Sequence, residues 1–256
     1  MSAAAPNETT EKRLTGKVPR ESIRMLDIPR VPKAIIDGFL ALGDLSSTVS
    51  DAMDEIGLYG VVPASTLRPT IPGSRIVGPA LTLRNIEQPF QAYKGAQDRT
   101  SRLAEIEGHN LAQPGDVLVI EGVADISNMG GISSTIAKRQ GEAAAIVDGA
   151  IRDIAESVSI GFPRWASSVS PITGKWRIQT VEINGPIHIC GVPVQPGDIV
   201  IADDDGVCFV SREHVEVVLR RATEIRAGET RRYNEIRAGV SVPDLAQRTY
   251  VYKFEK

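Results

Sequence analysis

The chain contains, at residues 143–153, the stretch AAAIVDGAIRD, which does most to decide its fold. The first half, 143–147, is a short apolar run that predicts a buried strand. Residues 154–158 read IAESV and predict the start of a helix. Strands and helices alternate on both sides of this unit, and such alternation predicts an α/β fold.

Working outward from this unit, we expect a helix after the hydroxyl-rich residues 46–50, closed by Gly57. The dipeptide Asn184-Gly185 predicts a hairpin between the strands that flank it. Residues after 211 predict helices that Gly228 and Gly239 interrupt or cap. The other expected helices are 34–42, 132–140 and 154–159, together with a helical segment at 93–108 that has room for a loop. The expected strands are 75–83, 117–120, 143–147, 164–168, 179–183, 187–190, 199–202 and 207–210.

One short pattern occurs twice, as QPGDVLVI at residues 113–120 and QPGDIVIA at residues 195–202. Pro fixes φ and Gly accepts a positive φ, so each copy predicts a turn that leads into a buried strand. A duplicated binding site is the alternative. Turn chemistry alone explains the repeat and favours two similar turns that feed one β core.

Composition limits the class of protein. The 256 residues carry a net charge of −3 and are 42% hydrophobic, which is ordinary for a soluble domain and gives no reason to expect nucleic acid as a partner. No apolar run reaches the roughly 18–20 residues that a membrane span needs. Cys190 and Cys208 lie in apolar runs and predict buried free thiols, hence a cytoplasmic location. Three histidines in all argue against a zinc site or a Ser-His-Asp triad. We expect His109 in a loop, in a structural or solvated role.

Residues 128–138 read NMGGISSTIAK and place paired glycines before a helix. A helix N-terminus offers unpaired N–H groups and a positive dipole end, and glycines let an anion approach the backbone. The alternative is an ordinary helix start at which the serines cap their own helix.

Arg152 and Asp153 follow the buried strand, at the end where α/β proteins tend to place ligands. The planar fork of arginine suits a carboxylate, and one carboxylate plus waters suits Mg²⁺. The alternative is a weak surface ion pair. Together with the glycine-serine segment, these residues predict a pocket for a metal-bound 2-oxo acid. Residues 203–206, DDDG, lack the spacing of a calcium loop and predict an acidic turn.

A series of motifs in order gives the chain a family resemblance. From about residue 46 to about residue 239, it resembles the family of 4-hydroxy-4-methyl-2-oxoglutarate aldolase and regulator of ribonuclease activity A. The motifs are TVSDA at 48–52, PGSRIVGPA at 72–80, PGDVLV at 114–119, GGIS at 130–133, DGAIRD at 148–153 and ADDDGV at 202–207.

The resemblance implies an α/β/β/α sandwich of the swivelling-domain type, with a helical C-terminal extension. It also implies homotrimers or homohexamers with active sites between subunits. We therefore expect a catalytic domain at 31–210 and an extension at 211–256 that contacts a neighbouring subunit. Residues 1–30 are polar, mixed in charge and without period, so we expect a flexible arm there.

For the site, the resemblance implies that Asp153 binds a divalent metal, Mg²⁺ or Mn²⁺ or another ion, and that Arg152 contacts the substrate. It implies that Glu229 reaches the site from a neighbouring subunit, with Glu235 as the alternative. The segment expected to hold the pyruvate carboxylate through its backbone is Gly130, Gly131, Ile132 and Ser133.

One position departs from the family pattern. Many of the aldolases carry Asp or Glu where this chain has Gly131, and that acid helps to activate a metal-bound water. Asp125 and Glu121 are candidates to replace it. We expect a metal-dependent, class II aldolase or lyase that cleaves a small 2-oxo acid through a pyruvate enolate, by retro-aldol reaction or oxaloacetate decarboxylation. The alternatives are a non-catalytic regulatory protein and a lyase or hydratase for a sugar-derived acid.

Overall fold

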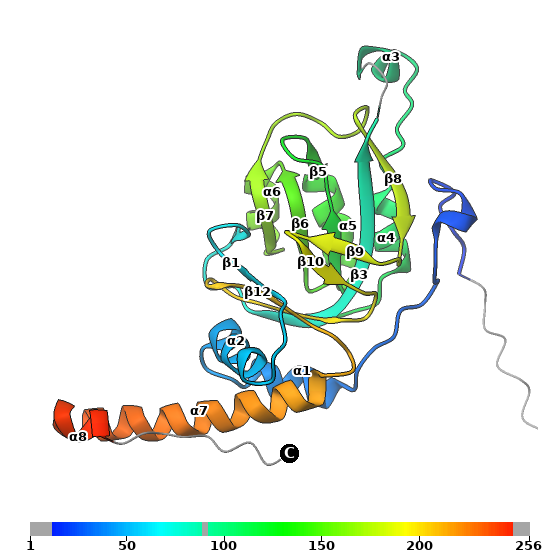
Figure 1. The fold of residues 1–256 in the computed structure, drawn as a ribbon. Coiled ribbons are helices and arrows are strands. Elements are labelled where there is room, and N and C mark those ends of the chain that lie inside the picture. Colours follow the sequence, from blue (N-terminus) through cyan, green and yellow to red (C-terminus); the bar gives the residue numbers. More distant parts are fainter. Residues whose placement is uncertain (1–11, 89–91, 248–256) are drawn as a thin grey trace, which may run out of the picture.

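The structure, a computed structural model, describes residues 12–88 and 92–247 (Figure 1). Its helices are η1 (Arg20–Ser22), α1 (Lys33–Leu40), α2 (Leu45–Glu55), α3 (Ala92–Gln97), α4 (Glu105–Leu111), α5 (Gly131–Gln140), α6 (Ile154–Ser159), α7 (Val215–Arg237) and α8 (Val242–Gln247). Its strands are β1 (Val61–Pro63), β2 (Arg68–Pro69), β3 (Ile76–Glu87), β4 (Val117–Glu121), β5 (Ser127–Met129), β6 (Ala144–Ile151), β7 (Arg164–Val169), β8 (Ile178–Ile183), β9 (Ile187–Ile189), β10 (Val192–Val194), β11 (Ile199–Ala202) and β12 (Gly206–Val210).

Ten of these strands form one mixed sheet in the order β1-β12-β11-β3-β4-β6-β7-β2, with β5 beside β6 and β8 beside β3. Strands β3, β4, β6 and β7 run parallel to one another, whereas β11 is antiparallel to the first residues of β3. The long strand β3 therefore belongs to two parts of the sheet. Its first residues pair with β11, and its later residues pair with β4.

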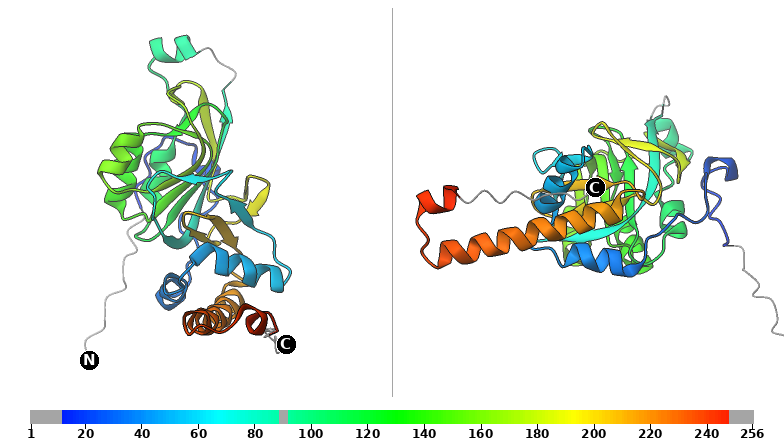
Figure 2. Two further views of the ribbon diagram at one scale, coloured as in Figure 1. Left: turned by 90° about the vertical axis from the view of Figure 1, so that its left-hand side faces the viewer. Right: turned by 60° about the horizontal axis from the view of Figure 1, so that its bottom comes forward.

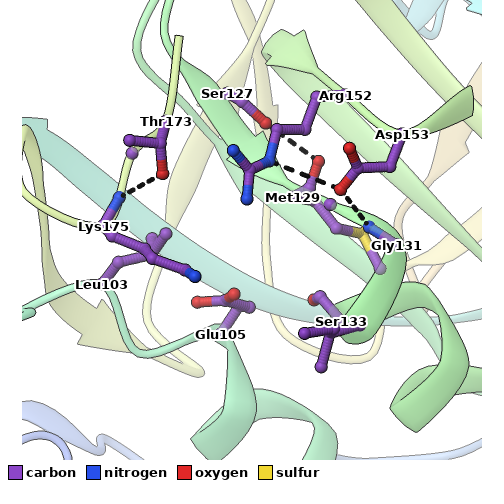
Figure 3. A pocket seen from close by; sticks show the side chains of 13 residues that line it. Leu103, Glu105, Ser127, Met129, Gly131, Ser133, Arg152, Asp153, Thr173 and Lys175 are labelled. Carbon is purple, nitrogen blue, oxygen red and sulfur yellow. Dashed lines mark hydrogen bonds and ion pairs between the residues drawn. The ribbon is translucent and has the colours of Figure 1, made fainter. Parts of the chain in front are cut away.

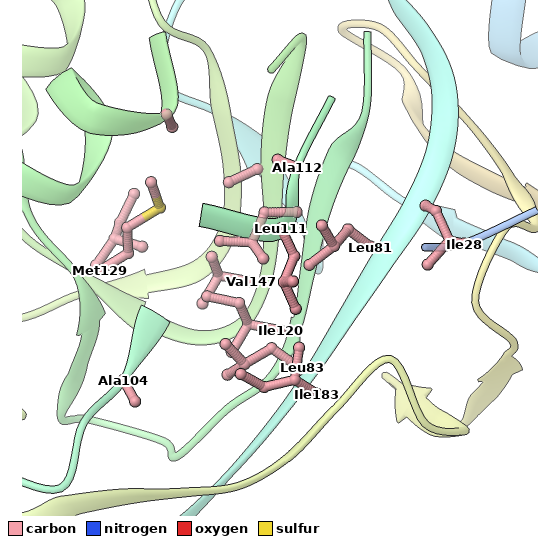
Figure 4. Close-up of a cluster of buried hydrophobic side chains, with 14 of the residues drawn as sticks. Ile28, Leu81, Leu83, Ala104, Leu111, Ala112, Ile120, Met129, Val147 and Ile183 are labelled. Atoms are coloured by element: carbon pink, nitrogen blue, oxygen red, sulfur yellow. The ribbon is translucent and has the colours of Figure 1, made fainter. Parts of the chain in front are cut away.

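Three hydrophobic cores separate four layers, which confirms the predicted sandwich. One core lies between the parallel strands and helices α4, α5 and α6 (Figure 4). A second lies between the two parts of the sheet. A third lies between β11 and β12 on one side and α1, α2 and α7 on the other. Two views at other angles show the long helix α7 beside α1 and α2, away from α4, α5 and α6 (Figure 2).

Burial on both faces explains why the central strands are continuous apolar runs. In β4, Val117 and Val119 enter the core between the sheets, while Leu118 and Ile120 enter the core below the helices. In β11, Val200 contributes to the core between the sheets. Its neighbours along the strand contribute to the core with α7. A polar residue at any of these positions would lie in apolar surroundings, since both faces are covered.

Strand β6 is longer than the apolar run at 143–147 predicts. Strand β6 continues through Asp148 to Ile151, with a register shift against β7 between Val147 and Ala150. Asp148 therefore lies within the strand and not in the turn that follows it. Its carboxylate accepts a hydrogen bond from the Cys190 amide at 2.6 Å. The strand-to-helix turn consists of Arg152 and Asp153 alone.

Other local expectations are also corrected. Asn184 has a positive φ but makes no hairpin, because β8 pairs with β3 and β9 pairs with β10. The helical segment expected at 93–108 does contain a loop, which separates α3 from α4. Gly228 lies inside α7 and does not interrupt it, whereas Gly239 has a φ of 78° just after the helix.

The repeated turns form as predicted. Gly115 and Gly197 have φ values of 92° and 85°. In both copies the Asp carboxylate accepts a hydrogen bond from the backbone amide of the Gln three residues earlier, at 2.8 Å. The two turns lead into β4 and β11, which lie in different parts of the same sheet. Turn chemistry therefore accounts for the repeat, as the simpler interpretation expects.

Both cysteines are free, and burial raises the pKa of the Cys190 and Cys208 thiols to about 12. In the described ranges, no helix combines the length and apolar character that crossing a bilayer requires.

Residues 12–30 are packed against the domain, which corrects the expected flexible arm over this part. Val18, Ile23 and Ile28 are buried in the core with α4 and α5. Ile23 bridges Ile183 of β8, and Arg30 forms an ion pair with buried Asp116 at 2.7 Å. These apolar residues are spaced irregularly, so no helical or strand period marked them. Residues 1–11 of the expected arm and 248–256 of the expected extension lie outside the described residues.

We predict that Ile23→Ala lowers the free energy of unfolding by about 2–4 kcal/mol, because a buried side chain is lost from a packed core. Met25→Ala is the matched control. The Met25 side chain is 40% exposed, so its loss should change stability by less than about 0.5 kcal/mol. Urea unfolding measures both. Equal small effects would show that the segment does not support the domain.

Candidate functional site

A pocket lies where β5 and β6 end and α5 and α6 begin (Figure 3). The two strands pair in parallel, so the turns that follow them lie at the same edge of the sheet. This is the edge at which open α/β sheets bind ligands. The pocket is lined by Leu103, Glu105, Ser127, Met129, Gly130, Gly131, Ile132, Ser133, Arg152, Asp153, Thr173, Gly174 and Lys175.

The predicted glycine-serine segment begins α5, with Gly130 as the N-cap residue. The Gly131 amide donates to Asp153 Oδ2 at 2.9 Å, so this amide is already engaged. The amides of Ile132 and Ser133 come next in the first turn, where N–H groups have no acceptor within the helix. These two amides and the positive end of the α5 dipole are what the segment offers an anion.

Asp153 adopts an unusual conformation, with φ 56° and ψ 49°. The left-handed region costs a non-glycine residue on the order of 1–3 kcal/mol, and such residues cluster at active sites. Asp is a preferred N-cap residue, yet Asp153 makes no side-chain cap bond to its own helix α6. Its carboxylate reaches the start of α5 instead and lies 3.4 Å from Arg152 Nε.

A buried arginine holds this turn from below. Arg164, at the start of β7, is fully buried. It donates to the carbonyl oxygens of Arg152 at 3.0 Å and Asp153 at 3.4 Å, and to Ser157 Oγ at 2.7 Å. Burial lowers the pKa of Arg164 to about 10, while the charge of Asp153 opposes that shift. The sequence analysis missed Arg164; its only signal is a charged residue at the head of a strand that continues as Trp165-Ala166.

The glycines permit the close approach of the two turns. A Cβ at Gly130 would lie 2.8 Å from Asp153 Oδ2 and 3.2 Å from Arg152 Nε. A Cβ at Gly131 would lie 3.0 Å from Glu156 Cγ and 3.2 Å from Asp153 Cβ. The Glu156 side chain thus borders the space that a side chain at position 131 would need. This geometry gives a physical reason for the glycine where the family pattern often has an acid.

The donor set suits a hard divalent ion that keeps much of its water. Within the described ranges, no three His, Cys, Asp or Glu side chains cluster so as to enclose a metal. The Asp153 side chain is 47% exposed, and one of its oxygens already accepts the Gly131 amide. A single half-exposed carboxylate beside a pocket leaves the other positions to water and to ligand oxygens, as Mg²⁺ accepts.

Two charged residues that the sequence analysis did not single out also line the pocket. Glu105, at the start of α4, and Lys175, in the loop before β8, lie across it from Arg152 and Asp153 (Figure 3). Burial raises the pKa of the Glu105 carboxyl, and the charges of His109, Lys175 and Arg152 act against that rise. The pocket therefore contains an acid, although not at the position where the family pattern led us to look.

His109 lies in α4 and is fully buried, which corrects its expected place in a loop. Its Nε2 lies 2.7 Å from Ser133 Oγ, and its Nδ1 lies 2.7 Å from Glu142 Oε1. The count of histidines had argued against any Ser-His-acid arrangement, but the fold assembles one. Ser134, the next residue, bonds to its own helix, because its hydroxyl donates to the Gly130 carbonyl at 2.9 Å, but no side chain caps α5.

Several predicted residues lie away from this pocket in the same chain. Asp125 is exposed, and Glu121 accepts the His188 amide at 2.8 Å, so neither lines it. Glu229 lies on α7, 3.4 Å from Arg226 and beside Asp51. Glu235 also lies on α7. Delivery of either α7 glutamate by a second copy of the chain remains a prediction.

The RraA-like family model, described as Aldolase/RraA, matches residues 46–209. A curated relative from Halalkalibacterium halodurans, named "Putative 4-hydroxy-4-methyl-2-oxoglutarate aldolase", is 33% identical over 81% of this chain and 90% of its own length. Protein DlpA of Legionella pneumophila is 28% identical over 81% of this chain, which spans only 32% of that relative.

Among solved structures, Streptomyces coelicolor RraAS2 is 25% identical, with a TM-score of 0.66 over 79% of this chain and 96% of that one. That protein is described as an unusual member of the RNase ES inhibitor RraA protein family. The matched region contains both turns of the pocket, the buried Arg164 and the strands that carry them. The chain therefore belongs to the RraA-like family.

Proposed function

We propose that the protein is a divalent-metal-dependent lyase that cleaves a small 2-oxo acid and leaves the enolate of pyruvate. The substrate is a 4-hydroxy-2-oxo acid cleaved by retro-aldol reaction, or oxaloacetate cleaved by decarboxylation. The names of relatives such as the Halalkalibacterium protein support this class of reaction. The metal would be Mg²⁺, Mn²⁺ or another hard divalent ion.

The observation that carries the proposal is the convergence of Arg152, Asp153 and the α5 N-terminus at one pocket. Asp153 Oδ2 accepts the Gly131 amide, and this contact places the carboxylate beside the remaining first-turn amides. A cation on Asp153 and an anion on those amides would be adjacent. A 2-oxo acid has a keto oxygen next to its carboxylate, so the keto oxygen could face the cation while the carboxylate meets the amides.

Each group has a separate task. When bound at Asp153, a divalent ion would supply positive charge to the oxygen on which the enolate charge develops. The amides of Ile132 and Ser133 would hold the substrate carboxylate at the helix end. The Arg152 guanidinium would orient the 2-oxo acid through its planar fork and stabilise the same developing charge. Arg164 would keep the Arg152–Asp153 turn in place during turnover.

The proposal includes a homo-oligomer, a trimer or a hexamer, in which Glu229 of a neighbouring copy faces the pocket. In one chain Glu229 lies on α7, which runs beside α1 and α2 and away from the pocket (Figures 1 and 2). Only a second copy could bring it there. Cross-linking or size measurement in solution tests the oligomer independently of activity.

We predict that Asp153→Asn lowers Mg²⁺-dependent release of pyruvate from oxaloacetate by about 10²–10³-fold, because a neutral amide cannot replace the carboxylate. Asp125→Asn is the matched control. Asp125 also has a left-handed backbone, with a φ of 59°, but it is exposed outside the pocket. Asn tolerates this conformation, so both variants keep the backbone.

A coupled assay for pyruvate compares parent, Asp153→Asn and Asp125→Asn, and thermal melts confirm that all three fold. The Asp125 variant should match the parent. If Asp153→Asn releases pyruvate as fast as the parent, Asp153 does not hold the metal. A parent that releases no pyruvate from any 2-oxo acid would refute the lyase and favour a binding or regulatory role.

We also predict that Mg²⁺ with oxalate, a mimic of the enolate, raises the melting temperature of the parent. Arg152→Lys should weaken apparent oxalate affinity by about 10–100-fold, since a lysine keeps the charge but loses the bidentate fork. Arg139→Lys, on the exposed side of α5, should bind like the parent. Equal oxalate titrations for all three proteins would show that Arg152 does not contact the ligand.

A further inference from the structure

A hydrogen-bonded chain of three side chains leads from the pocket into the protein interior. It begins at Ser133 on α5, passes through His109 on α4 and ends at Glu142 just after α5. Both contacts measure 2.7 Å, and all three residues are buried. Of the three residues, Ser133 is the one that lines the pocket, so the chain of hydrogen bonds reaches the pocket at this serine.

The partners fix the direction of the hydrogen bonds. With a neutral His109, the Glu142 carboxylate accepts from Nδ1–H, and the Nε2 lone pair accepts the Ser133 hydroxyl. A hydroxyl bonded to an imidazole whose far nitrogen is held by a carboxylate is the arrangement that turns a hydroxyl into a proton acceptor. The order along the chain is therefore the one that proton transfer at the pocket requires.

Packing alone does not account for these residues. A buried carboxylate is costly unless its oxygens are hydrogen-bonded, and a polar group that serves structure alone is often better replaced by an apolar one. Glu142 Oε2 has no hydrogen-bond partner among the described residues. By contrast, Ser134, one position along, satisfies its hydroxyl on a helix carbonyl, as a structural serine does.

We infer that Ser133 is the proton-transfer residue of this site, with His109 and Glu142 as the positioning residues that make its hydroxyl basic. The inference rests on the proposed lyase function, and it supplies the group missing at Gly131. The serine lies two residues further along α5 and reaches the pocket from the α4 side. Its activation comes from a second helix rather than from a carboxylate beside Asp153.

The relay takes up one proton from the substrate and returns one proton to the product. In a retro-aldol cleavage, the C4 hydroxyl of the substrate gives its proton to Ser133 Oγ while Ser133 gives its own to His109 Nε2. The O–H electron pair forms the new carbonyl, the C3–C4 bond breaks, and its electron pair remains on the pyruvate fragment as an enolate. His109 then returns the proton through Ser133 to C3, so pyruvate leaves and the three residues regain their starting state.

The competing proton donor is Glu105, which also lines the pocket and whose pKa is raised by burial. Among the residues that the structure describes, the Glu105 side chain forms no hydrogen bond with Ser133 or His109, so the two candidate groups are separate. Substitutions at Ser133 and at Glu105 therefore separate them.

The test is exchange of the pyruvate methyl protons with D₂O, followed by ¹H NMR with Mg²⁺ present. Exchange requires removal and return of a C3 proton and is thus a direct measure of the relay. We expect Ser133→Ala and His109→Gln to slow enzyme-catalysed exchange by about 10²-fold.

Ser134→Ala is the matched control, with the same substitution on the same helix, and should exchange at the parent rate.

Two further readouts separate loss of the relay from loss of the site. The melting temperature of Ser133→Ala should still rise with Mg²⁺ and oxalate, because the substitution removes the hydroxyl but keeps the backbone amides that would bind the anion. The ligand-free parent should give a downfield imidazole N–H signal from the His109–Glu142 bond that is absent from His109→Gln. If His109→Gln does not fold, Ser133→Ala decides alone.

The outcomes are distinct. Exchange by Ser133→Ala at the parent rate would overturn the inference while leaving the lyase intact. Loss of exchange in Glu105→Gln but not in Ser133→Ala would assign the proton transfer to Glu105 and overturn it as well. A parent that neither exchanges pyruvate nor decarboxylates oxaloacetate would refute the proposed function, and the relay with it.

Discussion

The site depends on the buried guanidinium of Arg164. This side chain lies beneath the Arg152–Asp153 turn and donates to both of its carbonyl oxygens and to Ser157 of the following helix. These bonds stabilise the left-handed backbone of Asp153 and offset its conformational cost. As a result the Asp153 carboxylate does not cap its own helix but faces the first amide of α5. One buried cation thus sets the direction of the Asp153 carboxylate.

Charge as well as geometry joins these residues. A guanidinium without a carboxylate bonded to it is expensive to bury, and the charge of Asp153 partly compensates that of Arg164. Arg164 therefore stabilises the turn through hydrogen bonds to its carbonyl oxygens, and the negative charge of Asp153 stabilises the Arg164 cation. The parallel pairing of β5 with β6 brings the α5 N-terminus against the same turn, and Gly130 permits the contact because it has no Cβ. Strand order, one arginine and one glycine together define the pocket.

The fold could be predicted because its evidence is local. The apolar runs of β4, β6 and β11 are buried on both faces, so neither face carries a polar residue and the runs are visible without any knowledge of their neighbours. The site could be predicted only in outline. Arg152 and Asp153 stand beside each other in sequence, whereas Arg164 contacts them across 11 and 12 positions, and nothing in a linear pattern specifies that contact. The segment 12–30 escaped detection for a related reason, since its buried residues have no period and are defined only by the core that they complete.

The glycine at position 131 and the buried Ser133–His109–Glu142 chain lie on different faces of the first turn of α5. At position 131 a side chain would meet Glu156 and Asp153 within about 3 Å, so the face of α5 toward α6 has little room for another carboxylate. The opposite face of the same helix turn lies against α4, where His109 replaces what would otherwise be an apolar contact. A histidine there is acceptable only if both ring nitrogens are satisfied, and Ser133 and Glu142 are placed to do so. In the proposed mechanism, proton transfer therefore takes place on the α4 face of the α5 N-terminus, while the Asp153 carboxylate and the first-turn amides keep their positions on the other face.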